Sequence, residues 1–119
     1  MRLAGGGATG AQAGDTSVVG TWNRTLVAVD ETGDVTTSET TWTFAADGRA
    51  TRRIVTSSLS LGLADQTLAT GRWTTEGDEL VVRFDPPTGG ELRLPFQVRV
   101  QLDGTLLVLG GQLFRLVAP

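Results

Sequence analysis

Turn-forming residues divide most of this chain into short segments in which apolar and polar residues alternate. This pattern constrains the fold more than any other feature. Successive side chains of a β-strand point to opposite faces, so alternation marks a strand with one buried face. The clearest case is residues 92–100, where five apolar residues from Leu92 to Val100 alternate with arginine, proline and glutamine. No segment of useful length has the period of a helix, so the sequence predicts an all-β protein.

Eight such segments follow one another along the chain, each joined to the next by a short turn. Asp47-Gly48 is a strong hairpin signal, and Pro86-Pro87 interrupts the pattern because neither proline can donate a ladder hydrogen bond. Residues 60–66 fit either the end of a long hairpin or a short helix. Pro95, on the polar side of its segment, indicates an edge or a bulge. The predicted strands are 18–29, 35–44, 49 to about 59, 67–75, 79–84, 92–100, 105–109 and 112–117.

Eight short strands joined by tight turns suit an antiparallel meander, either closed as a barrel or split as a sandwich. Closure is favoured because it leaves no open edge on strands this apolar. We therefore expect an eight-stranded antiparallel up-and-down β-barrel over residues 18–119. A Gly- and Ala-rich flexible tail, residues 1–17, precedes it, and Asp15-Thr16-Ser17 can cap a brief turn there. A barrel of this size is either filled by side chains or holds one small ligand.

Two short motifs near opposite ends of the chain point to a family. Gly20-Thr21-Trp22 opens the first strand, and Phe114-Arg115-Leu116 places an arginine in the last one. Over roughly residues 18–117 this arrangement resembles the lipocalin (calycin-like) family, and most of all its small bacterial lipocalin-like domains. The resemblance implies that Trp22 closes one end of the barrel and that Arg115 packs across the indole ring as a stacked cation. It implies no particular ligand.

The residue types missing from the chain limit its chemistry. Without His or Cys, the usual ligands of zinc, copper and haem are missing, so we expect no metal site and no cofactor. The same absences remove the histidine base and the cysteine nucleophile, and the chain has no Tyr. An enzyme would have to work with carboxylates and arginine alone. We therefore expect a non-enzymatic protein.

Charge and hydropathy limit its partners and its location. A net charge of -3 at pH 7 argues against nucleic acid, which needs a basic face. No apolar run approaches the roughly 20 residues of a transmembrane helix. The composition of residues 1–14 suits the linker of an exported periplasmic or lipid-anchored envelope protein whose signal has been removed. A cloning remnant explains it nearly as well, and a cytoplasmic location is the alternative. The sequence leaves the oligomeric state open.

Two arginine positions are candidates for binding a ligand inside the barrel. Alternation from Trp22 turns Arg24 inward, where its guanidinium can hold a carboxylate or phosphate. The competing interpretations are that a bulge turns Arg24 outward or that an internal acid neutralises it. Of the neighbours Arg52 and Arg53, one must point inward. The sequence does not decide which, and Arg52 is taken as the candidate.

Three aromatic residues, Trp42, Phe44 and Trp73, complete the candidate site. They either line a pocket for an apolar molecule or fill the core, and the dense packing of protein interiors favours filling. The first hypothesis is therefore a barrel that binds a small apolar or amphipathic molecule through these residues and the two arginines. The second hypothesis, from another class, is a filled barrel whose outer face or rim loops bind a protein partner.

Overall fold

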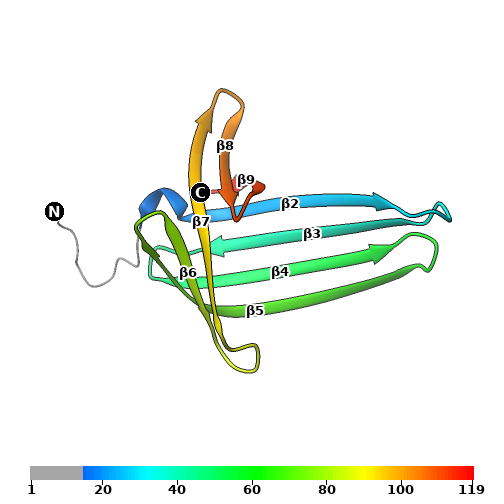
Figure 1. The fold of residues 1–119 in the computed structure, drawn as a ribbon, viewed down its shortest axis with the longest axis horizontal. Coiled ribbons are helices and arrows are strands. Elements are labelled where there is room, and N and C mark those ends of the chain that lie inside the picture. Colours follow the sequence, from blue (N-terminus) through cyan, green and yellow to red (C-terminus); the bar gives the residue numbers. More distant parts are fainter. Residues whose placement is uncertain (1–14) are drawn as a thin grey trace.

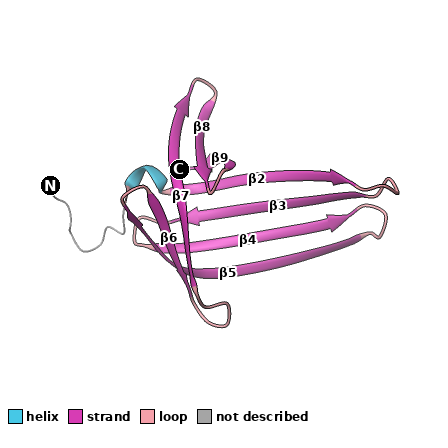
Figure 2. Cartoon of the chain, viewed as in Figure 1, coloured by secondary structure: helices cyan, strands magenta, loops and turns pink. Residues whose placement is uncertain are grey.

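The computed structural model describes residues 15–119, which form one closed antiparallel barrel of eight strands (Figure 1). Each strand pairs with its neighbours in sequence, and the first strand, β2, also pairs with the last, β9. Strands and turns make up almost all of the described chain (Figure 2). The predicted up-and-down barrel is thus confirmed. The elements are η1 (Thr16–Val18), β2 (Gly20–Val29), β3 (Val35–Phe44), β4 (Arg49–Ser58), β5 (Leu63–Glu76), β6 (Glu79–Phe84), β7 (Glu91–Gln101), β8 (Gly104–Leu109) and β9 (Gln112–Ala118).

The ambiguous stretch before the fourth predicted strand is part of a long hairpin. β5 begins at Leu63, directly after the turn at residues 59–62. It pairs with β4 without interruption from Ser58↔Leu63 to Arg49↔Arg72. The reason is non-local, because the ten residues of β4 offer a complete ladder to the returning chain. The helical alternative is therefore wrong.

The folded domain begins slightly before residue 18. Asp15 caps η1, since its Oδ1 accepts a hydrogen bond from the backbone nitrogen of Ser17 at 3.0 Å. Val18 at the end of η1 is fully buried. Residues 1–14 of the predicted tail lie outside the described residues. No helix in residues 15–119 is long and apolar enough to span a membrane.

Side chains from all parts of the barrel fill the ring where the strands close on one another. The largest fully buried residues include Trp22, Phe44 and Phe114, and each such side chain contributes about 1.5–3 kcal/mol through burial. The Nε1 group of Trp22 donates to the carbonyl oxygen of Val18 at 2.8 Å. This bond fastens η1 against the ring at the end from which β2 starts.

The predicted stacking of Arg115 on Trp22 is wrong. The two residues lie on neighbouring strands, but Trp22 is opposite Leu116, while Arg115 is opposite Asn23. Since side chains alternate, the apolar Phe114 and Leu116 take the inner face of β9 and Arg115 lies exposed on the outer face. The indole of Trp22 is therefore buried without a guanidinium beside it.

β7 changes partner at Pro95. It pairs with β6 as far as Glu79↔Pro95 and with β8 from Phe96↔Leu109 onward. A residue without an N–H group fits the point where one ladder ends and the other begins. Residues 91–95 have no strand partner on the β8 side, so of the two irregularities expected at Pro95 the structure shows a local edge, at the point where β7 changes partner.

The barrel wall is much taller on one side than on the other. β2 to β5 pair along their whole lengths, but β9 reaches β2 only at Thr21–Asn23, and β6 pairs with β5 only from Gly71 onward. The outer parts of these four strands, residues 24–40 and 53–68, stand beyond the closed ring as a sheet (Figure 1). We call this sheet the tall wall. Along the tall wall, barrel closure therefore leaves one open strand edge on β2 and one on β5, contrary to the expectation that it leaves none.

Candidate functional site

The inner face of the tall wall continues the barrel interior beyond the filled ring. Register and alternation place these side chains on the same side as Trp22 and Trp42. Most carry hydroxyl groups, three are apolar, one is an arginine and one is an aspartate. The inner face comprises Arg24, Leu26 and Ala28 of β2, Thr36, Ser38 and Thr40 of β3, Ile54, Thr56 and Ser58 of β4, and Asp65 and Thr67 of β5.

Arg52 lies at the boundary between the filled ring and the inner face. Its guanidinium carbon is 4.8 Å from the ring centroid of Phe84 and 5.7 Å from that of Trp42. The side chain reaches from β4 toward β6 across Ala69 and Gly71 of β5, which are too small to block it. Two aromatic faces therefore hold the cation by attraction to their π-electrons.

The protein leaves one donor of this cation unsatisfied. Nε of Arg52 is buried and has no hydrogen-bond partner among residues 15–119. Buried donors are nearly always paired, and an unpaired one costs about 1–3 kcal/mol. The ion pairs within this range of the chain involve Arg83 and Arg93 on the outer surface, not Arg52. The charge of Arg52 is therefore held in place but not neutralised by a carboxylate of the described chain.

Arg24 lies one step farther out on the same face. The register of β2 and β3 runs without a bulge from Gly20 to Val29, so Arg24 points inward as predicted and lies opposite Thr40. Ile54 is the next residue across the sheet, two positions from Arg52. Standard strand spacing puts the Cα atoms of the two arginines about 12 Å apart. Side chains of this length can converge on one anion from that separation.

The three candidate aromatic residues fill the core. Trp42, Phe44 and Trp73 are all buried, with Trp42 stacked on Phe44 at 5.4 Å and Phe44 edge-on to Trp73 at 5.6 Å. The Nε1 group of Trp73 also donates to the carbonyl oxygen of Ala45 at 2.8 Å. This geometry favours the core-filling interpretation. Trp42 adds to the candidate site by holding Arg52.

Arg53 points outward, in line with the expectation that only one of the neighbouring arginines faces inward. It is exposed, and its Nη2 donates to Oε1 of Gln66 at 3.2 Å. Arg53 therefore provides a matched control for Arg52, with the same chemistry one residue away on the opposite face.

Phe84 was not among the residues that the sequence singled out, although it contacts Arg52. The alternation of Leu80, Val82 and Phe84 already indicates an inward ring at the end of β6. Phe84 can contact Arg52 of β4 only because Ala69 and Gly71, in the intervening strand β5, have small side chains. That requirement becomes visible only once the strand register is known.

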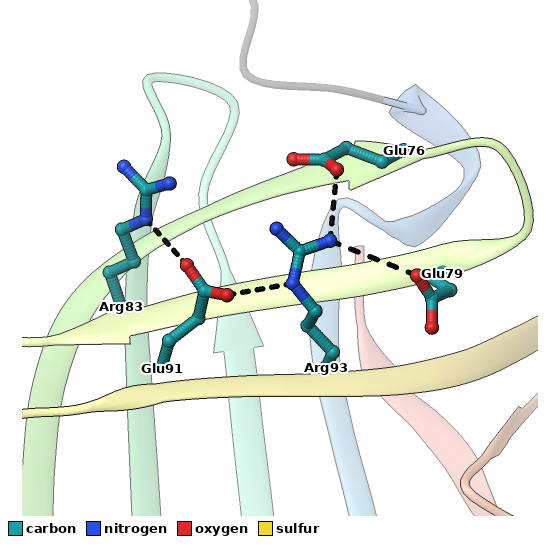
Figure 3. Close-up of polar contacts among 5 residues, drawn as sticks. All are labelled: Glu76, Glu79, Arg83, Glu91 and Arg93. Atoms are coloured by element: carbon teal, nitrogen blue, oxygen red, sulfur yellow. Dashed lines mark hydrogen bonds and ion pairs between the residues drawn. The ribbon is translucent and has the colours of Figure 1, made fainter.

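Two arginines and three glutamates on the outer face of β5, β6 and β7 form a network of ion pairs (Figure 3). Arg93 lies 2.7 Å from Glu91, 2.9 Å from Glu76 and 3.8 Å from Glu79, and Arg83 lies 2.9 Å from Glu91. Hydrogen bonds from Arg93, and then from Arg83, lower the pKa of Glu91. Those to Glu76 and Glu91 raise the pKa of Arg93. Exposed pairs like these add little stability. Residues 15–119 contain no cluster of acidic residues arranged to hold a metal ion.

Open hollows lie on the outer side of the barrel. One of about 530 Å³ borders the charged network, beside Arg72 and Val81. Another of about 440 Å³ lies near the tip of the tall wall, between Val35, Leu59 and Ala64. Their volumes are in the range of ligand pockets, but neither lies within the ring, which the core fills.

Comparisons with known proteins identify no relative. No family model, no curated protein and no solved structure matches this chain. The lipocalin-like resemblance therefore still depends on the short motif at residues 20–22 and on the position of the arginine in the last strand, whereas the barrel itself is established by its strand pairing.

Proposed function

We propose that this barrel is a non-enzymatic binding protein for a small amphipathic molecule that carries an anionic group. The observation that carries this proposal is the state of Arg52, a cation that lies over two adjacent aromatic rings, with a buried Nε that has no partner in the described chain. Carboxylates and phosphates bind arginine through charge-assisted hydrogen bonds. Arg24, on the same face, supplies a second positive charge for the same anion.

The inner face offers the rest of the ligand both apolar and polar contacts. Leu26 is 50% exposed there, and Ile54 lies beside Thr40, so an apolar chain along the wall would cover apolar surface next to hydroxyl groups. The filled ring argues against a wholly apolar ligand, because such a molecule needs an enclosed apolar cavity. An amphipathic molecule thus fits better than the purely apolar alternative.

Decanoate and decanol provide a direct test, since they share a chain and differ in the charged group. We expect decanoate, and not decanol, to bind in isothermal titration calorimetry and to raise the thermal midpoint of unfolding. R52Q should weaken decanoate binding about tenfold or more, since hydrogen bonds to a charged group contribute about 1.5–3 kcal/mol. R24Q should weaken it less, because Arg24 lies farther from the ring.

R53Q is the matched control and should bind decanoate as the unaltered protein does. Thermal unfolding of each variant without ligand would separate lost binding from lost folding. The proposal fails if neither decanoate nor decyl phosphate binds, or if R53Q weakens binding as much as R52Q.

The docking of a protein partner is the second candidate function. It is favoured by the outer hollow at the tip of the tall wall, where Leu59 is 77% exposed and Leu61 is also exposed. Exposed apolar groups that gather around a hollow are typical of interaction sites. A photo-crosslinker at Leu59 that captures one defined protein, while one at the exposed Val117 does not, would favour this candidate.

A further inference from the structure

β2 has a free edge along the tall wall. β3 pairs with β2 from end to end, but β9 covers it only at Thr21–Asn23. The N–H group of Asp30 donates to the carbonyl oxygen of Asp34 across the hairpin at 3.0 Å. Backbone groups of successive strand residues point to opposite sides, so even-numbered residues of β2 face β3 and odd-numbered ones face away. The residues whose backbone groups face the open side of the tall wall are Thr25, Val27 and Val29.

This edge lacks the devices that usually protect an open strand. Edge strands are commonly blocked by charged residues, prolines or bulges. The stretch from Thr25 to Val29 contains no charge and no proline, and its register with β3 has no bulge. Val27 and Val29 are 59% and 66% exposed. The free edge of β5, by contrast, carries Asp65.

The charges that flank this stretch make it complementary to a second copy of itself. Arg24 and Asp30 lie at equal distances from Val27. If two copies of β2 pair antiparallel about Val27, each Arg24 lies opposite Asp30 of the other copy, and each Thr25 lies opposite Val29. The backbone directions agree with this register, since Thr25, Val27 and Val29 are then the hydrogen-bonded positions. Arg24 and Asp30 take the positions where opposite side chains are closest.

The Asp30 carboxylate is oriented and ionised for such a contact. Its Oδ1 accepts hydrogen bonds from the nitrogen and hydroxyl of Thr32 and from the nitrogen of Asp34. Oδ2 is the atom that would meet the guanidinium of the second copy. The Thr32 hydroxyl, and then the Asp34 amide, also lower the pKa of Asp30, which keeps the group charged.

We propose that two copies of this chain pair through β2, in the register centred on Val27, and so join their tall walls into one continuous antiparallel sheet with two-fold symmetry. The hydrogen bonds run between Val27 and Val27 and between Thr25 and Val29, in both directions. Arg24–Asp30 pairs flank them on the inner face. This inference goes beyond ligand binding: both use Arg24, but the pairing of the two copies requires no ligand.

Introduced cysteines test the register, because the chain has no cysteine of its own. In the proposed dimer the two Val27 Cα atoms lie about 5.5 Å apart, within the range of a disulfide. The two Val29 Cα atoms lie about 14 Å apart. V27C should therefore form a disulfide-linked dimer under mild oxidation, and V29C should not. Equal cross-linking of both variants, or none of V27C, would overturn the proposal.

Charge reversal tests the same interface without oxidation. R24D alone and D30R alone should each dissociate the dimer about tenfold or more readily in analytical ultracentrifugation, because like charges then face each other. An equimolar mixture of the two variants should dimerise again, since every facing pair is then oppositely charged. R99D, an equal charge change on exposed β7, should leave the dimer intact. Variants that dimerise singly like the unaltered chain, or a mixture that stays monomeric, would refute the pairing.

Discussion

Gly71 of β5 lies opposite Phe84 of β6 and leaves no room for a side chain. A Cβ atom built there would lie 2.2 Å from the carbonyl oxygen of Arg83 and 2.9 Å from the Cα atom of Phe84, far inside van der Waals contact. The strands must therefore separate to admit even a methyl group. We expect G71A to lower the free energy of unfolding by about 1–3 kcal/mol, the usual cost of overpacking. The midpoint of urea unfolding measures this change.

Gly33 provides the control for this prediction. It has a φ of +87°, but a Cβ there would meet nothing within 4 Å, so G33A tests backbone strain without a clash. The expected cost is about 1–2 kcal/mol, the penalty of the left-handed conformation. If G71A folds as stably as the unaltered chain, β5 and β6 are not held at the distance described.

At the scale of the element, one carboxylate ties together the tips of two hairpins. Asp34, the residue before β3, accepts a hydrogen bond from the Ser58 hydroxyl at 3.1 Å and one from the Ser60 nitrogen at 3.2 Å. Hydrogen bonding by Ser60, and then by Ser58, lowers the pKa of Asp34 from its ordinary value of 3.8. Asp34 thus links the β2–β3 hairpin to the turn between β4 and β5.

This contact makes the tip of the tall wall sensitive to acid. The pKa is lower in the folded chain than in the unfolded one, so ionised Asp34 stabilises the fold above pH 3.8. That contribution is lost as the pH falls through the folded pKa. NMR titration of the Asp34 carboxyl carbon should give a midpoint below 3.8, and S58A should raise it. A midpoint at or above 3.8 would contradict the contact.

The sequence predicted the strands better than their lengths and contacts. Alternation and turn residues located every strand, because both signals are local. The sequence left residues 60–66 open between a hairpin end and a helix, because the pairing of β5 from Leu63 depends on β4 and because Leu59 and Leu61 are apolar residues in an exposed turn. Inward-facing Arg24 followed from alternation alone.

Which of Arg52 and Arg53 faces inward depends on the register between β3 and β4. Alternation within one strand does not fix that register. The contact of Arg52 with Phe84 needed the closed barrel. The outward position of Arg115 was predictable, since two apolar residues flank it. In that case the family resemblance led to the wrong contact.

For the whole molecule, the joint between β2 and β9 is the weakest part of the closed wall. These strands pair only at Thr21–Asn23, with a register shift between Thr21 and Trp22, whereas β3 pairs along its full length on both sides. We expect the amides of β9 to exchange with deuterium through openings of lower free energy than those of β3. Native-state hydrogen exchange monitored by NMR measures both, and equal protection of the two strands would contradict this expectation.

That joint is also where the first and last strands of the barrel meet, since Thr21 lies opposite Ala118. Every other strand pairing connects neighbours in the sequence, so loop-closure entropy is large at this one place alone. A short linker between β9 and β2 would make the backbone of the barrel circular. A circular backbone of this kind could be opened at an exposed turn, which would give circular permutants that keep all eight strand pairings.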